Sequence, residues 1–144
     1  MYHKAPRLIK GALFQDERGS LTSCNDFHME TVKRMYIIKP ASVAIIRAWQ
    51  AHRVEEKWFC CLSGSFELKL LAIKNFNNPS DYLIPLTYYL DSASPAIVYV
   101  PGGYANGFKA SSENSALMVY SSFSLAQSKA DDFRYPADKW NLWE

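Results

Sequence analysis

The chain has 144 residues, of which 49% are hydrophobic and 15% aromatic, so we expect one domain, residues 1–144, with a buried core. Its formal net charge is only +2 and it has no run of Lys or Arg, which argues against nucleic acid as a partner. No apolar stretch has the length of a membrane span, the first residues lack the apolar core of a signal peptide, and the three cysteines form no disulfide pattern, so we expect a cytoplasmic protein with no membrane partner.

Short runs of β-branched and aromatic residues dominate the sequence, and Gly, Pro, Asn or Ser separate them. The clearest run alternates strictly, with Phe66, Leu68 and Leu70 on one face and Glu67 and Lys69 on the other. In chain order, the predicted strands are residues 8–14, 35–38, 43–49, 57–62, 65–70, 82–90, 96–100 and 116–120, and one helical turn is predicted within 124–133. Many short strands separated by turn signals are typical of an all-β sandwich or barrel.

The segment RAWQAH carries the first candidate catalytic side chain. Gln50 and His52 share one face of a strand, whereas Arg47 has the opposite parity and reaches that face only from a barrel mouth or through a bulge. A neutral His52 can remove a proton beside a ketone, and Lys57 can stabilise the resulting oxyanion. The alternative interpretation is a solvated histidine and a surface lysine.

Five segments resemble those of cupins that act on nucleotide-linked sugars. KRMY at 33–36, RAWQAHR at 47–53 and LSGSFE at 62–67 are similar to the dTDP-sugar 3,4-ketoisomerases, whose patterns are close to KRxY, RGxHAHK and LSGSxE. FQDERG at 14–19 and PGGYANGF at 101–108 are similar to the dTDP-4-dehydrorhamnose 3,5-epimerases, which show FxDxRG and PxGFAHGF. The resemblance covers most of the chain and implies an all-β cupin jelly-roll barrel with a short helical or irregular C-terminal tail.

The resemblance also implies roles for individual residues. Lys57 matches the epimerase lysine that stabilises an enolate, and His52 matches the second histidine of the ketoisomerase motif. Arg47 would contact the diphosphate or the sugar, and Arg18 would reach a nucleotide in the neighbouring subunit of a strand-exchanged homodimer. The other predicted substrate contacts are Tyr36, Gln50, Tyr104 and Asn106.

Several positions depart from the family patterns. Gln50 stands where the epimerases have their basic histidine, and a neutral amide cannot accept a proton. Asn106 replaces a further histidine, and no tyrosine lies near Leu125, where the epimerases place their acid. Ala48 replaces a glycine, which makes a bulge at this point harder. A standard double epimerisation is therefore not expected, whereas a single proton transfer through His52 is.

The same substitutions argue against a metal. Metal-binding cupins carry histidines at the positions of Gln50 and Asn106, and amide oxygens are poor ligands for iron or zinc. We therefore predict neither a metal nor another cofactor. A metal site formed by His52, Glu56 and water is the weakest of three hypotheses.

Two functions are better supported. The first is an isomerase or epimerase that enolises a nucleotide-linked (dTDP) 4-keto-6-deoxy sugar in cell-surface polysaccharide synthesis. The second is a catalytically inactive cupin that binds a sugar or nucleotide, which the missing imidazoles favour. In either case the tail aromatics would pack over the barrel mouth, as a lid or dimer contact, or would stack on a base: Phe133, Tyr135, Trp140 and Trp143.

Overall fold

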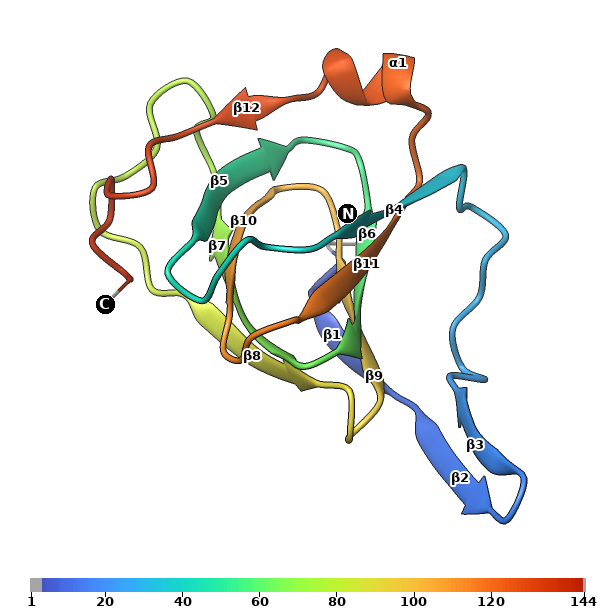
Figure 1. Cartoon of the computed structure of the whole chain (residues 1–144). Coiled ribbons are helices and arrows are strands. Elements are labelled where there is room, and N and C mark those ends of the chain that lie inside the picture. The colour runs from blue at the N-terminus through green and yellow to red at the C-terminus, as the bar shows by residue number, and fades with distance from the viewer. Residues whose placement is uncertain (1–3, 144) are drawn as a thin grey trace.

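The computed structural model describes residues 4–143, and ten of its strands form two antiparallel sheets that face each other (Figure 1). In spatial order, the first sheet contains β1 (Arg7–Lys10), β9 (Ala96–Val100), β6 (Lys57–Ser63), β11 (Ala116–Ser121) and β4 (Arg34–Ile38). The second contains β12 (Phe133–Arg134), β5 (Ile46–His52), β10 (Tyr104–Ala110), β7 (Ser65–Ala72) and β8 (Leu86–Asp91). The remaining elements are the hairpin β2 (Ala12–Asp16) and β3 (Gly19–Ser23) and the short helix α1 (Leu125–Lys129).

The core lies between the two sheets. The alternation predicted for β7 is confirmed, because its three apolar side chains are buried and the intervening Glu and Lys are half-buried. Phe108 of β10 joins the sheets, with its ring centroid 6.2 Å from those of both Phe59 on β6 and Phe66 on β7. Burying each such side chain contributes about 1.5–3 kcal/mol. The predicted all-β jelly-roll barrel is therefore confirmed.

Some strand boundaries differ from the prediction, because close packing of the backbone decides them rather than the strand propensity of the residues. The run predicted at 8–14 divides at Gly11, where a Cβ atom would lie 2.5 Å from the carbonyl oxygen of Ser23. Residues 82–85 were predicted as part of a strand but lie outside β8. The strand β10 was not predicted, because it contains Asn and Gly, which are unusual in strands. β10 nevertheless pairs with both β5 and β7, and there Gly107 is needed because a Cβ would lie 2.7 Å from that of Ala48.

The C-terminal segment crosses one end of the barrel and then turns outward (Figure 1). β12 is the edge strand and pairs with β5, and the rings of Trp140 and Trp143 lie 5.5 and 5.6 Å from that of Trp49. The partners of these tryptophans include Leu71 and Ala105, which face away from the barrel interior. Trp140 and Trp143 thus cover the outer face of the second sheet rather than the barrel mouth, which corrects the expected lid for these two residues. Tyr135 also borders the cavity of the barrel.

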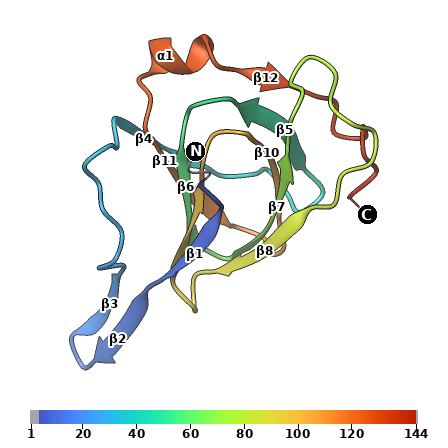
Figure 2. The same ribbon diagram turned by 180° about the vertical axis from the view of Figure 1, so that it is seen from behind.

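The hairpin β2–β3 projects from the body of the molecule in both views (Figures 1 and 2). Phe14 and Leu21 lie opposite each other in its register, and they are 58% and 60% exposed. Within residues 4–143 there is no helix that is both long and apolar enough to span a membrane.

Candidate functional site

A cavity of about 690 Å³ opens into the barrel beside α1 and β12. This volume lies within the range of small-molecule sites. Its wall comes from both sheets and from the C-terminal segment: Arg34, Tyr36, Ile38, Ile46, Arg47, Ala48, Trp49, Gln50, Lys57, Phe59, Asn106, Phe108, Leu125, Ser128, Lys129, Asp132, Arg134 and Tyr135.

The wall of this cavity is strongly cationic. Among the described residues that line it, the cations are Arg34, Arg47, Lys57, Lys129 and Arg134, and the one carboxylate is that of Asp132. The whole chain has a net charge of only +2, so positive charge is concentrated at this site. Clustered cations in a concave, partly desolvated wall favour an anionic ligand.

Arg34 is a cavity residue that the sequence analysis did not select. Its Nε donates to the carbonyl oxygen of Phe123 at 3.1 Å, and its guanidinium lies 5.1 Å from the ring centre of Tyr36. An Nη lies 3.5 Å from the fully buried carboxylate of Glu55, to which Ser121 also donates at 2.7 Å. These contacts fix the guanidinium at the cavity wall. The sequence did contain a signal for this residue, because Arg34 lies two residues before Tyr36 on the same strand and therefore shares its face.

The strand β5 changes its register where it meets the cavity. Asn106 lies opposite Gln50 but Gly107 lies opposite Ala48, so one residue of β5 is extra. This irregularity brings Arg47 and Gln50 to the same cavity despite their opposite parity. This register shift matches one of the two routes predicted for Arg47, the other being the barrel mouth, and it occurs although Ala48 makes a bulge harder. Gly107 on the facing strand supplies the space that Ala48 needs.

Gln50 lies at the centre of a chain of polar contacts in the cavity wall. Lys57 Nζ donates to Gln50 Oε1 at 2.9 Å, and Gln50 Nε2 donates to Asp132 Oδ1 at 3.1 Å. Asn106 Nδ2 donates to the backbone oxygen of Gln50 at 3.2 Å. The amide of Gln50 therefore has a fixed orientation between a cation and a carboxylate.

Lys57 is buried in this wall, with 3% of its surface exposed. It is the first residue of β6 and shares a face with Phe59, which directs its side chain inward. In the described part of the chain no carboxylate lies within 4 Å of its Nζ. Burial lowers the pKa of this amine to about 8. The phenol of Tyr36 lies on the same wall, and burial raises its pKa to about 12, so it stays neutral.

His52 is also buried, at 3% exposed, but it does not line the cavity. Its Nδ1 lies 2.6 Å from the backbone oxygen of Asp131, so Nδ1 donates and Nε2 holds the lone pair. Nε2 has no hydrogen-bond partner among residues 4–143. Burial and the neighbouring Lys57 lower the pKa of His52, so the imidazole is neutral at physiological pH.

The remaining predicted residues lie elsewhere. Tyr104 is half-buried against the barrel core, opposite His52 on the next strand, and does not line the cavity. Arg18 lies in the turn of the projecting hairpin, where its Nη is 2.6 Å from Asp16. Of the eight predicted site residues, the cavity wall thus contains Tyr36, Arg47, Gln50, Lys57 and Asn106.

The C-terminal segment supplies wall residues that the sequence analysis missed. Lys129 ends α1, and Asp132 and Arg134 follow it, with Arg134 Nε donating to Asp132 at 3.0 Å. Nothing in their local spacing marked them as site residues. In the described residues, no group of three or more His, Cys, Asp or Glu side chains is placed to hold a metal ion.

Solved structures of similar shape are sugar-nucleotide enzymes. QdtA from Thermoanaerobacterium thermosaccharolyticum, a sugar 3,4-ketoisomerase solved with TDP, is 21% identical with a TM-score of 0.70, over 94% of this chain and 92% of QdtA. A 3,4-ketoisomerase from Helicobacter canadensis is 17% identical with a TM-score of 0.71, over 97% and 98% of the two chains. The dTDP-4-dehydrorhamnose 3,5-epimerase of Bacillus anthracis is 16% identical with a TM-score of 0.73, over 92% and 79%. At these identities the likeness establishes the fold.

A comparison with curated protein sequences found no match. The sequence profile of the FdtA family, described as WxcM-like, C-terminal, matches residues 4–135, which is most of the chain. The cupin-like barrel, its cationic cavity and this match lead to one conclusion: the chain belongs to the FdtA (WxcM-like, C-terminal) family.

Proposed function

We propose that the protein is a cytoplasmic isomerase of a dTDP-linked 4-keto-6-deoxy sugar and serves cell-surface polysaccharide synthesis. The observation that carries this proposal is the cavity wall, in which one carboxylate lies among five cations, one of them the buried Lys57. QdtA, a structural neighbour, was solved with TDP-4-keto-6-deoxyglucose, a ligand of this chemistry.

The cations of the wall are suited to the diphosphate. Arg47 makes no ion pair or hydrogen bond to another described residue, so its guanidinium is available for bidentate contact with phosphate oxygens. Lys129 and Arg134 approach the same space from the C-terminal segment. The neutral Tyr36 can donate its hydroxyl to a sugar oxygen, and Asn106 can contact the sugar through its amide.

The chemistry proposed for this site is enolisation. His52 removes the proton next to the ketone, the C–H electron pair forms a carbon–carbon double bond, and the carbonyl pair moves to the oxygen. The Lys57 ammonium donates a hydrogen bond to that oxyanion. Return of the proton to the opposite face of the same carbon epimerises that carbon, whereas its delivery to the former carbonyl carbon, with transfer of the neighbouring hydroxyl proton to the oxyanion, moves the ketone by one position. Because His52 Nε2 lies behind the cavity wall, the proposal requires that the bound sugar reach this atom.

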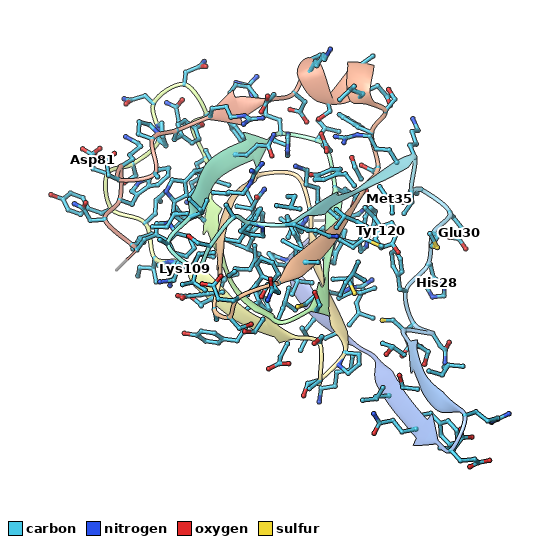
Figure 3. The ribbon with its side chains drawn as sticks, viewed as in Figure 1. His28, Glu30, Met35, Asp81, Lys109 and Tyr120 are labelled. Atoms are coloured by element: carbon cyan, nitrogen blue, oxygen red, sulfur yellow. The ribbon has the colours of Figure 1, made fainter. Side chains whose placement is uncertain are left out.

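Proton exchange tests this assignment. The protein is incubated with dTDP-4-keto-6-deoxyglucose in deuterated water, and deuterium in the sugar ring is measured by mass spectrometry. We expect incorporation with the wild type and a loss of about 10²–10⁴-fold in His52→Ala. His28→Ala is the matched control, since His28 lies on the exposed loop before β4, away from the cavity (Figure 3). Exchange that survives in His52→Ala would show that another group is the base.

A binding module is the second candidate function. The amides of Gln50 and Asn106 occupy the cavity wall, and neither can accept a proton from carbon. Tight binding of dTDP by calorimetry, without deuterium incorporation from any 4-keto sugar, would support this function instead.

We also propose that the protein is a homodimer in which the hairpin β2–β3 of each copy packs against the other. The exposed pair Phe14 and Leu21 would be covered, and Arg18 at the hairpin turn would be carried to the partner. The receiving surface is the outer face of the first sheet, where Met35 lies opposite Tyr120 and is 50% exposed (Figure 3).

Light scattering after gel filtration tests the dimer. The double variant Phe14→Asp, Leu21→Asp should elute as a monomer, because two buried carboxylates cannot be desolvated without partners. Tyr89→Asp, which changes a still more exposed aromatic residue on β8, should remain a dimer. A monomeric wild type would rule the proposal out.

A further inference from the structure

Asp131 connects the C-terminal segment to the turn between β5 and β6. Its Oδ1 accepts the backbone N–H of Arg53 at 2.8 Å, and its Oδ2 accepts those of Val54 and Glu55, both at 2.9 Å. Asp131 is buried, and its own N–H donates to the backbone oxygen of Ser128 at 3.0 Å. Its side chain and backbone are therefore both fixed.

The backbone oxygen of the same residue accepts from His52 Nδ1 at 2.6 Å. A carbonyl oxygen only accepts, so this contact favours the tautomer that carries its proton on Nδ1. Nε2 is left as the acceptor, buried and without a partner in the described chain.

A second acceptor competes for the same nitrogen. Glu55 Oε1 is fully buried, lies 3.6 Å from His52 Nδ1 and has no hydrogen bond to a described residue. A carboxylate paired with an imidazole stabilises the imidazolium, whereas a neutral carbonyl does so much less. The other charged groups near the ring are Lys57 and the carboxylates of Asp131 and Asp132. Either acceptor leaves the lone pair on Nε2, but pairing with the carboxylate would raise the pKa of His52 and favour the protonated ring, which cannot remove a proton.

We infer that Asp131 is a positioning residue, which holds His52 as the neutral Nδ1–H tautomer and keeps it from pairing with Glu55. The three N–H groups on its carboxylate fix the carbonyl that directs the imidazole. The catalytic consequence rests on the proposed function, but the tautomer of His52 is a property of the folded protein alone.

Nitrogen-15 NMR of histidine-labelled protein reads the tautomer directly. The chain has three histidines, and the signal of His52 is identified by its absence in His52→Asn. In the wild type we expect protonated Nδ1 and unprotonated Nε2. In Asp131→Ala we expect the ring to pair with Glu55, with the proton still on Nδ1 but a higher pKa of His52, and in Asp131→Asn, which keeps one acceptor oxygen, a smaller rise of that pKa. Asp138→Ala alters an exposed carboxylate of the same segment and should leave the His52 signals unchanged.

Two results would overturn the inference. One is a wild-type His52 that carries its proton on Nε2. The other is an unchanged pKa of His52 in whichever of Asp131→Ala and Asp131→Asn folds, as judged by circular dichroism. Should Asp131→Ala not fold, Asp131→Asn decides.

Activity measurements separate this inference from the proposed function. If the protein is the proposed isomerase, Asp131→Asn should lower kcat at least about tenfold, shift the acid limb of the pH profile upward and leave dTDP affinity unchanged. A wild type that exchanges no proton would refute the proposed function, while the NMR result would still decide the role of Asp131.

Discussion

The two ends of the β5–β6 connection hold their ionisable side chains in different ways. His52, at the end of β5, lies behind the cavity wall with one nitrogen hydrogen-bonded and the other without a partner in the described chain. Lys57, at the start of β6, lies in the wall itself and donates only to the neutral amide of Gln50. The first arrangement fixes a protonation state, and the second keeps a positive charge in contact with any ligand. Only four residues of the chain lie between His52 and Lys57.

The largest effect that would test this comparison is the loss of the Lys57 ammonium. Lys57→Met keeps a long apolar side chain but removes the donor to the oxyanion, and we expect deuterium exchange to fall about 10²–10³-fold. Binding of dTDP should change little, since Arg47 and Arg134 remain. Lys69→Met is the matched control, because Lys69 lies on β7 outside the cavity and pairs with Glu67 at 3.0 Å. An undiminished rate in Lys57→Met would mean that the amine does not contact the reacting oxygen.

The same variant should be more stable than the wild type. Burial lowers the pKa of Lys57 from 10.5 to about 8 in the folded state, so folding is disfavoured wherever the amine is charged in both states, below pH 8. Between pH 8 and 10.5 the unfolded state binds more protons, so this penalty decreases as the pH rises. Lys57→Met should therefore raise the free energy of unfolding by about 1–3 kcal/mol at pH 7 and by less at pH 10. Urea unfolding at both pH values measures the difference, and a destabilised variant at pH 7 would contradict it.

The sequence predicted most of the strands, because these depend on local alternation, but it did not predict β10. It could not predict that the C-terminal segment covers His52, since that contact joins residues 79 positions apart. The same limit applies to Asp132 and Arg134, which enter the cavity wall only because β12 pairs with β5. The sequence showed that Gln50 stands where the epimerase pattern has its base, but the contacts of Gln50 on both sides became visible only in the structure.

The pH dependence of exchange separates the two residues. His52 must be neutral, and its pKa is lowered from 6.5, so activity should fall only below pH 6.5. Lys57 must be charged, so activity should fall as the pH rises through about 8, approaching tenfold per pH unit. Lys57→Arg should shift the alkaline limb upward and leave the acid limb in place. If both limbs stay in place in Lys57→Arg and in Asp131→Asn, neither Lys57 nor His52 controls the rate.

The smallest expected effect comes from placing an imidazole in the wall itself. Gln50→His would lie beside Asp132, whose Oδ1 is 3.1 Å from Gln50 Nε2 and could accept the imidazole N–H. If the depth of His52 limits proton removal, exchange should rise several-fold, up to about tenfold. Gln50→Leu, which adds no base, should show no gain. An unchanged rate in Gln50→His would mean that the substrate already reaches His52 Nε2. The distance of His52 from the cavity wall would then not limit proton removal, and the tautomer held by Asp131 would affect the rate more than this distance does.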